Sequence, residues 1–270
     1  MESALDWHTA KALLDWQIEL GADEAIGDTP VDRFAVAKAD AEAAANKAKE
    51  PARDSRTAAT PQVQERTEID AVEVARHAAS AATSLDTLRE AMAGYDHCAL
   101  KRGARNLVFS DGNPAARLMI LGEAPGRDED REGRPFVGRA GRLLDRMLDA
   151  IEMDRTTDTP DRAVYITNVL PWRPPQNRDP EPEEIAMMLP FVQKHIELAN
   201  PDVIVLMGNI ACRAGLGRQG ILRLRGKWAE AFGRPAMPMT HPAYLLRQPH
   251  AKRDAWADLL AIRARLGGAS

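Results

Sequence analysis

The sequence has little of what membrane proteins, disulfide-rich proteins and cysteine-ligated metal proteins need. Its two cysteines, Cys98 and Cys212, stand far apart, so the chain can build neither a disulfide framework nor a four-cysteine metal site. No apolar run approaches the ~20 residues that cross a bilayer, and the first residues lack the basic and apolar regions of a secretion signal. We therefore expect a soluble, cytoplasmic protein with no membrane segment.

The sequence also lacks an excess of positive charge, because its 36 Lys and Arg residues are outnumbered by 40 Asp and Glu residues, which gives a net charge of −4. The deficit lies in residues 1–100, which hold 10 basic and 19 acidic side chains, whereas residues 101–270 hold 26 and 21. Most cations in the second part are arginine, which forms forked hydrogen bonds with phosphate. This excess favours a nucleic-acid partner, although an ordinary solvated surface explains it equally well.

Composition divides the chain into three parts. Residues 1–34 have apolar side chains at helical spacing from Leu5 to Leu20, which predicts an α-helical N-terminal extension that either packs on the main domain or binds a protein partner. Residues 35–66 have few large apolar side chains, which predicts a flexible low-complexity linker. Residues 67–270 are expected to form one α/β domain that begins with a helix over residues 69–93.

Strand and helix patterns alternate in this third part. Apolar runs predict strands over 118–121, 163–167, 203–207 and 236–240, and amphipathic stretches predict helices over 142–151, 183–198, 210–216 and 252–266. The alternation predicts a central, mainly parallel four-stranded sheet with helices on both faces. Parallel strands bring their carboxyl ends to one edge, where open α/β folds bind ligands.

Polar residues follow each predicted strand at that edge. Glu123 stands in a Gly-Pro-Gly turn after the first strand, Asn168 ends the second, Gly208-Asn209 follows the third and His241 follows the fourth. Each of them alone has an ordinary structural explanation. A carboxylate, an amide and an imidazole at one edge of a sheet together predict a ligand site.

These side chains suit cleavage of an N-glycosidic bond. The Asn168 amide complements a pyrimidine edge, and Phe136, just beyond the first turn, offers a ring for stacking. His241 can donate to an oxygen on which negative charge develops, while the Glu123 carboxylate can orient water and stabilise a nearby cation. The departing base takes negative charge and the sugar becomes oxocarbenium-like, so each group has a part in the reaction.

Four segments of the chain resemble the family 4 uracil-DNA glycosylases. They are GEAPGRDED with GRPFVGRAGRLLDRML (122–148), VYITNVLPWRPPQNRDPEPEE (164–184), PDVIVLMGNIA (201–211) and HPAYLLR (241–247). The resemblance implies a DNA-repair enzyme that flips uracil out of single- or double-stranded DNA and hydrolyses its N-glycosidic bond with water. These segments contain no lysine that would form a Schiff base, so we expect a monofunctional glycosylase of base excision repair.

The resemblance also implies roles for individual residues. Glu123 would handle the attacking water, with Glu129 as the alternative, and the sequence does not decide between them; His241 would donate to the uracil O2. The implied uracil-binding residues are Phe136, Asn168, Gly122, Ala124 and Gly126, and the implied DNA-binding residues are Pro125, Arg173, Gly208, Asn209, Pro242, Tyr244, Leu245 and Arg247. Leu245 would be the wedge that enters the vacated base stack. Gly126 stands where some relatives exclude thymine with a tyrosine, so our hypothesis is that Glu129 guards the C5 side of the base.

One feature of this family is missing. Family 4 members usually hold an iron–sulfur cluster on four cysteines, and this chain has Tyr95, Cys98, Trp172 and Met188 at the corresponding positions. A single thiolate cannot hold a cluster. We therefore expect no cofactor, and we expect the three bulky side chains to fill the volume by packing.

Two alternatives stay open. A glycosylase of the same fold could remove another deaminated base, such as hypoxanthine or xanthine. A non-catalytic DNA-binding or polymerase-associated module could recruit a partner through its N-terminal helix. We expect a monomer, and the sequence does not reveal a preference for single or double strands.

Overall fold

The computed structural model describes residues 70–267, and the predicted N-terminal helix and linker lie outside this range. Within it, a six-stranded sheet has the order β1-β3-β2-β4-β6-β5. Its four central strands are parallel: β2 (Leu118–Gly122), β3 (Val164–Asn168), β4 (Val203–Met207) and β6 (Arg234–Met239). The predicted mainly parallel sheet with helices on both faces is confirmed.

Two short antiparallel strands extend the sheet beyond the predicted four. β1 (Asp111–Gly112) pairs with β3, and β5 (Ala229–Ala231) pairs with β6. Strands of two and three residues are too short to show an alternating pattern. They cover the edges of the parallel sheet.

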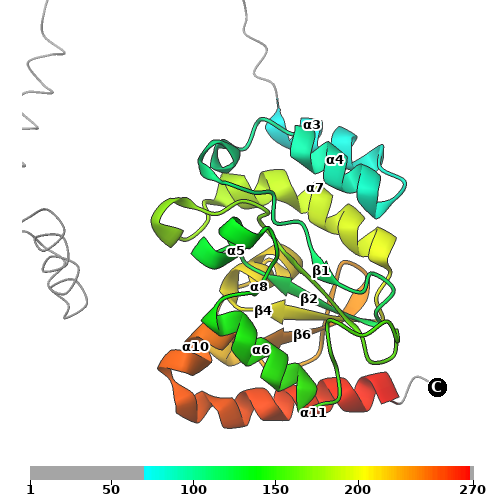
Figure 1. Cartoon of the computed structure of the whole chain (residues 1–270), viewed down its shortest axis with the longest axis vertical. Coiled ribbons are helices and arrows are strands. Elements are labelled where there is room, and N and C mark those ends of the chain that lie inside the picture. Colours follow the sequence, from blue (N-terminus) through cyan, green and yellow to red (C-terminus); the bar gives the residue numbers. More distant parts are fainter. Residues whose placement is uncertain (1–69, 268–270) are drawn as a thin grey trace, which may run out of the picture. The chain divides into compact units, whose positions relative to one another are not determined.

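Side chains of the central strands alternate between two cores. Leu118 and Ile120 belong to a cluster with residues of α6 (Arg139–Asp149) and α11 (Lys252–Gly267). Met119 and Leu121 belong to a second cluster with residues of α7 (Pro182–Ala199) and α8 (Asn209–Leu216). Because both faces are covered, as Figure 1 shows, the strands consist of unbroken apolar runs.

A further pair of helices packs on the outer side of α7 (Figure 1). The single helix expected over residues 69–93 is two helices, α3 (Ala71–Ser80) and α4 (Leu85–Gly94). A capping box between Ser84 and Thr87 starts the second helix. A third apolar cluster fills the space between this pair and α7.

Short helices occupy segments for which the apolar pattern predicts no helix. They are α5 (Arg127–Glu132), α9 (Ile221–Leu224) and α10 (Pro242–Arg247), with single turns η1 (Ala99–Gly103), η2 (Pro175–Asn177) and η3 (Pro249–Ala251). α5 follows β2 and α10 follows β6, so both start at the carboxyl edge of the sheet. Among the described helices, none is long and apolar enough to span a membrane.

Candidate active site

A cavity of about 590 Å³ lies at the carboxyl ends of the parallel strands. Glu123 follows β2, Asn168 ends β3, Gly208 follows β4 and His241 lies just beyond β6. All four residues line the cavity. The strand ends that the sequence predicted to converge do meet around one space.

Phe136 forms a wall of the cavity next to His241. The two rings stack with their centroids 5.3 Å apart and their planes 27° apart. The Phe136 backbone is left-handed, with φ 55°, which is rare for a bulky residue. Gly122 lies directly behind this wall, because a Cβ there would overlap the Asn168 Oδ1 and lie 2.6 Å from the Phe136 Cε2. Gly122 therefore permits the close packing of the site without lining the cavity.

The side-chain amide of Asn168 is available to a ligand. The residue is only 7% exposed, yet within residues 70–267 its amide has no hydrogen-bond partner. The preceding residue, Thr167, instead donates to the Phe109 carbonyl at 2.7 Å. Buried amides are normally paired, so Asn168 is poised to bind a ligand with complementary polar groups.

The imidazole of His241 is held as a neutral donor. Its Nδ1 accepts the Ala243 N–H at 3.1 Å, which leaves the proton on Nε2. Burial and the nearby Arg247 guanidinium lower the pKa of His241 to about 4. At neutral pH the ring is uncharged and can donate its Nε2 proton to an oxygen that gains negative charge.

Glu123 has the properties of a base that works near neutral pH. Burial and the nearby carboxylate of Asp179 raise the pKa of Glu123 to about 7. The carboxyl lines the cavity. A group with this pKa can accept a proton from water at physiological pH.

The Glu129 carboxylate is bonded to the backbone on two sides. Its Oε1 accepts the N–H groups of Val137 and Gly138 at 3.0 and 2.9 Å, and its Oε2 accepts that of Gly126 at 3.1 Å. The Glu129 carboxylate therefore positions these turns, and its role toward the attacking water stays a prediction. Glu129 does line the cavity beside Gly126, so its role as guard of the C5 side stays a prediction.

The implied uracil- and DNA-binding residues are only partly gathered at the cavity. Those that line it are Ala124, Pro125, Gly126, Asn209, Tyr244 and Arg247. Arg173 and Pro242 do not line it, and the Arg173 Nε donates to the Asn177 Oδ1 at 2.8 Å. Asn209 also supports α9, since its Oδ1 accepts the N–H groups of Gly220 and Ile221 at 3.1 and 2.9 Å.

The prediction that Leu245 is the wedge does not fit this structure. Leu245 is 1% exposed and packs in the core with α6 and α11, so it cannot enter a base stack. The apolar pattern predicts no helix over 241–247, but Pro242 begins the helix α10. This helix turns residue 245 inward and leaves Leu246 38% exposed beside Arg247.

One wall of the cavity carries residues for which the sequence predicted no role. The Pro-rich loop after β3 contributes Pro174, Asn177, Arg178 and Asp179, and other segments contribute Ala140, Ile210, Ile221 and Ala243. The Arg178 guanidinium makes two bonds to the Glu184 carboxylate, at 3.0 and 2.6 Å, which anchors the loop to α7. The available signal was the group of charged residues within PPQNRDPEPEE.

The sequence profile of the Uracil DNA glycosylase superfamily matches residues 109–260. The chain belongs to this superfamily. It is 36% identical to a type-4 uracil-DNA glycosylase of Sulfurisphaera tokodaii over 67% of this chain and 84% of that protein. It is 37% identical to a type-4 uracil-DNA glycosylase of Archaeoglobus fulgidus over 66% of this chain and 92% of that protein. It is 41% identical to a type-4 uracil-DNA glycosylase of Thermotoga maritima over 56% of this chain and 77% of that protein. A DNA polymerase of Bacillus phage SP01 matches at 33% identity over 58% of this chain and 16% of the polymerase.

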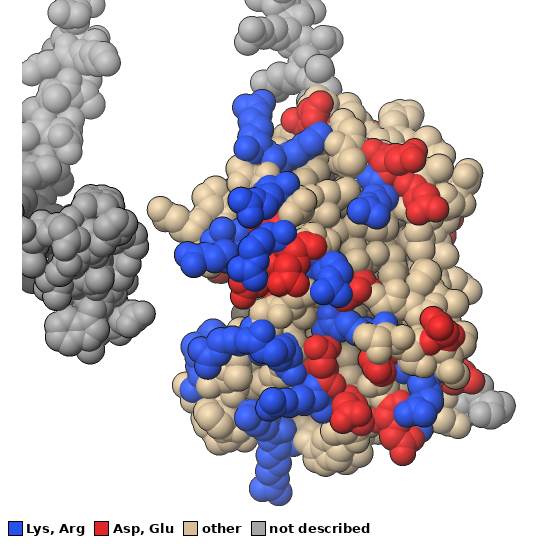
Figure 2. Space-filling view, in the orientation of Figure 1, with Lys and Arg blue, Asp and Glu red and all other residues tan. Residues whose placement is uncertain are grey.

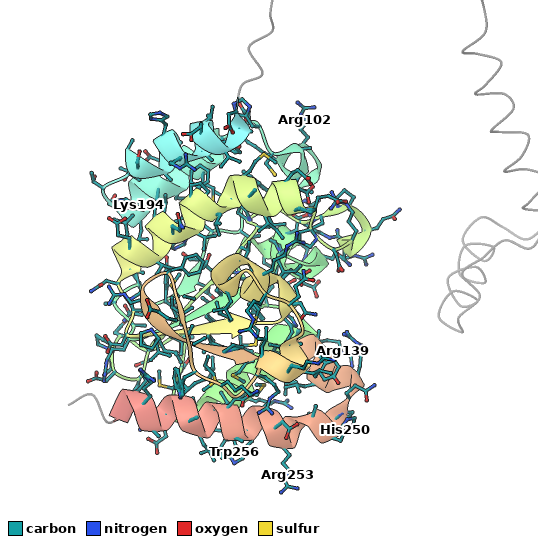
Figure 3. All side chains as sticks on the ribbon, turned by 180° about the vertical axis from the view of Figure 1, so that it is seen from behind. Arg102, Arg139, Lys194, His250, Arg253 and Trp256 are labelled. Atoms are coloured by element: carbon teal, nitrogen blue, oxygen red, sulfur yellow. The ribbon has the colours of Figure 1, made fainter. Side chains whose placement is uncertain are left out.

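Arginine side chains border the cavity of this superfamily member. Figure 2 shows Lys and Arg gathered on the side of the molecule where α5, α6 and α10 lie. Arg127, Arg139 and Arg142 are exposed there and form no ion pair with another described residue. Figure 3 shows Arg139 on this same side, which is the right-hand side in that view, whereas Arg253 projects away from α11 at the bottom. Arg127 and Arg139 adjoin the lining residues Gly126 and Ala140 in the chain, and exposed arginines without ion pairs suit contacts with a phosphate backbone.

The positions at which family 4 glycosylases usually carry cluster cysteines are packed with apolar side chains. Tyr95, Cys98, Trp172 and Met188 are all buried in the third apolar cluster, together with Phe191. Burial raises the pKa of the Cys98 thiol, which disfavours the thiolate that metals bind. Within residues 70–267, no group of three His, Cys, Asp or Glu side chains is arranged to hold a metal ion. The residues present do not fit an iron–sulfur cluster.

Proposed function

We propose that this protein removes uracil from DNA by hydrolysing its N-glycosidic bond, as a monofunctional glycosylase of base excision repair. The observation that carries the proposal is the meeting of three groups in one cavity: the unpaired Asn168 amide, the Phe136 ring and the neutral His241 donor. The type-4 uracil-DNA glycosylases among the relatives support the same conclusion.

The cavity accounts for recognition of a flipped uracil. The base stacks on Phe136, and the Asn168 amide pairs with its Watson–Crick edge. Its Nδ2 donates to the uracil O4, and its Oδ1 accepts the N3 proton. Cytosine presents a donor and an acceptor in the opposite order, so the same amide rejects it.

The chemistry follows from two of the titratable groups that line the cavity, His241 and Glu123. When the bond between C1′ and N1 breaks, its electrons go to the base, and the His241 Nε2–H donates to the developing charge on O2. Ionised Glu123 stabilises the oxocarbenium-like sugar and accepts a proton from the water that attacks C1′. The products are uracil and an abasic site in an uncut strand.

We further propose that the protein works without an iron–sulfur cluster. Aromatic and thioether packing around Trp172 and Met188 replaces the ligands, and the Arg178–Glu184 pair orders the Pro-rich loop. The purified protein should be colourless and free of iron. A brown protein that contains iron and absorbs near ~400 nm would overturn this proposal.

An excision assay on uracil-containing oligonucleotides tests the function. The wild type should produce alkali-labile abasic sites, and Asn168→Ala and His241→Ala should each slow excision by roughly 10²- to 10³-fold. His77→Ala is the matched control, because His77 is exposed on α3 and should have no effect.

The same assay separates the alternatives. Faster excision of hypoxanthine or xanthine than of uracil would assign a different substrate. DNA binding by the wild type without any excision would favour a non-catalytic module. Strand breaks that appear without alkali or heat would contradict a monofunctional reaction.

A further inference from the structure

We propose that Arg155 is a positioning residue that holds the Phe136 backbone in the conformation needed for stacking on uracil. The inference rests on the proposed function. Arg155 lies in the connection between α6 and β3, outside the cavity and outside the four segments that resemble family 4 glycosylases. Its importance is visible only in its contacts.

The Arg155 side chain is 9% exposed, and four of its five N–H donors form hydrogen bonds. Nη1 donates to the Pro135 carbonyl at 3.0 Å and to the Asp111 Oδ2 at 3.1 Å. Nη2 donates to the Phe136 carbonyl at 3.1 Å and lies 2.6 Å from the Asp145 Oδ1, to which Nε also donates at 2.8 Å. Two carboxylates therefore hold the guanidinium, and its remaining donors hold two successive carbonyls of the stacking segment.

These two carbonyls belong to a strained part of the backbone. Phe136 has φ 55°, a conformation that a bulky residue keeps only where its surroundings impose it. Arg155 binds the segment through its carbonyls, and Glu129 binds it through the N–H groups of Val137 and Gly138. Gly141 completes the support, because any Cβ at this position would overlap the Phe136 carbonyl oxygen.

Arg155 also links the stacking ring to the strand that carries the amide. Its partner Asp111 lies on β1, where it pairs with Ile166, two residues before Asn168 on β3. Its other partner, Asp145, lies on α6. Loss of the guanidinium would release the Phe136 backbone and change the distance between the ring and the amide that together enclose the base.

The test is single-turnover excision from a uracil-containing oligonucleotide by Arg155→Gln, with Arg117→Gln as matched control. Arg117 is also partly buried between two carboxylates, Asp202 and Asp161, but it lies at the start of β2, at the opposite edge of the sheet. Both variants should melt at a lower temperature. Only Arg155→Gln should slow excision, by roughly 10- to 100-fold, and Arg155→Lys should recover part of the rate.

A double variant separates positioning from general stability. If Arg155 acts through Phe136, then Arg155→Gln with Phe136→Ala should be no slower than Phe136→Ala alone. Multiplied losses in the double variant, or wild-type excision by Arg155→Gln, would overturn the inference. Should Arg155→Gln fail to fold, Asp145→Asn weakens the same clamp and must show the same non-additivity. An inactive wild type would instead refute the proposed function.

Discussion

Replacing Glu123 by glutamine should abolish excision and stabilise the folded protein above pH 7. Burial and the Asp179 carboxylate raise the pKa of Glu123 from 4.5 to about 7. Between these two values the folded protein binds the proton more tightly than the unfolded chain does. The free energy of unfolding therefore falls as pH rises through this range, and Glu123→Gln removes that loss.

The pKa shift sets the size of the effect. It corresponds to at most roughly 3 kcal/mol of unfolding free energy. Glu123 is only partly buried and lines a cavity, so its charge is partly screened, and we expect a gain on the order of 1–2 kcal/mol at pH 8. Near pH 4 the carboxyl is protonated in both states, and the gain should vanish.

Glu129→Gln is the matched control, because it is the same substitution in the same segment. The Glu129 carboxylate accepts three backbone N–H groups, and hydrogen bonds to a charged group contribute roughly 1.5–3 kcal/mol each. A neutral amide has a single acceptor oxygen. Glu129→Gln should therefore lower the free energy of unfolding at pH 8, opposite to Glu123→Gln.

Urea unfolding at pH 4 and pH 8 measures the stabilities, and single-turnover excision between pH 5 and 9 measures the rates. The wild-type rate should rise up to about pH 7 and then level off, since only the ionised Glu123 accepts a proton. Asp179→Asn removes one cause of the raised pKa and should move this rise to lower pH. A flat rate profile, or a Glu123→Gln protein that is less stable than wild type at pH 8, would refute the assignment.

Three further predictions follow from buried or exposed side chains. The exposed Leu246 is the candidate wedge in place of the buried Leu245, so Leu246→Ala should slow excision from duplex DNA more than from single strands, and an equal loss of rate on both substrates would exclude this role. Leu245→Ala should instead lower the unfolding free energy by about 2–5 kcal/mol. Burial lowers the pKa of His195 to about 3, so its contribution to stability is present above pH 6.5 and is lost as pH falls towards 3. Urea unfolding of His195→Gln between pH 7 and 4 should show a weaker pH dependence than wild type, and an unchanged slope would contradict this. Gly141→Ala should melt at a much lower temperature because its Cβ would overlap a carbonyl, whereas Gly94→Ala has open space at the corresponding point and should melt near the wild-type temperature.

The sequence predicted the centre of the fold because burial on both faces produces continuous apolar runs. It also predicted which polar residues meet, since parallel strands place Glu123, Asn168 and His241 at one edge. The edge strands β1 and β5 were missed because two or three residues show no period. The six residues of α10 show no helical period either, and this hid the inward turn of Leu245.

The supporting contacts of the site could not be predicted from local pattern. Arg155 reaches a carbonyl twenty residues earlier in the chain, and nothing in its neighbouring residues indicates this. The position of Asp179 beside Glu123 depends on the course of the Pro-rich loop, which the packing around Trp172 and the Arg178–Glu184 pair determines. Such contacts arise from tertiary structure alone.

The two helices that cover α7, α3 and α4, determine where an N-terminal truncation of the domain can begin. The superfamily match begins at residue 109, but the Tyr95 hydroxyl donates to the Ala71 carbonyl at 2.7 Å, and its ring packs edge-on against Phe191. A fragment that starts at 109 would leave Phe191, Met188 and Trp172 in contact with water, and we expect it to aggregate. An N-terminal truncation of this protein should therefore keep every residue from Ala71 onward.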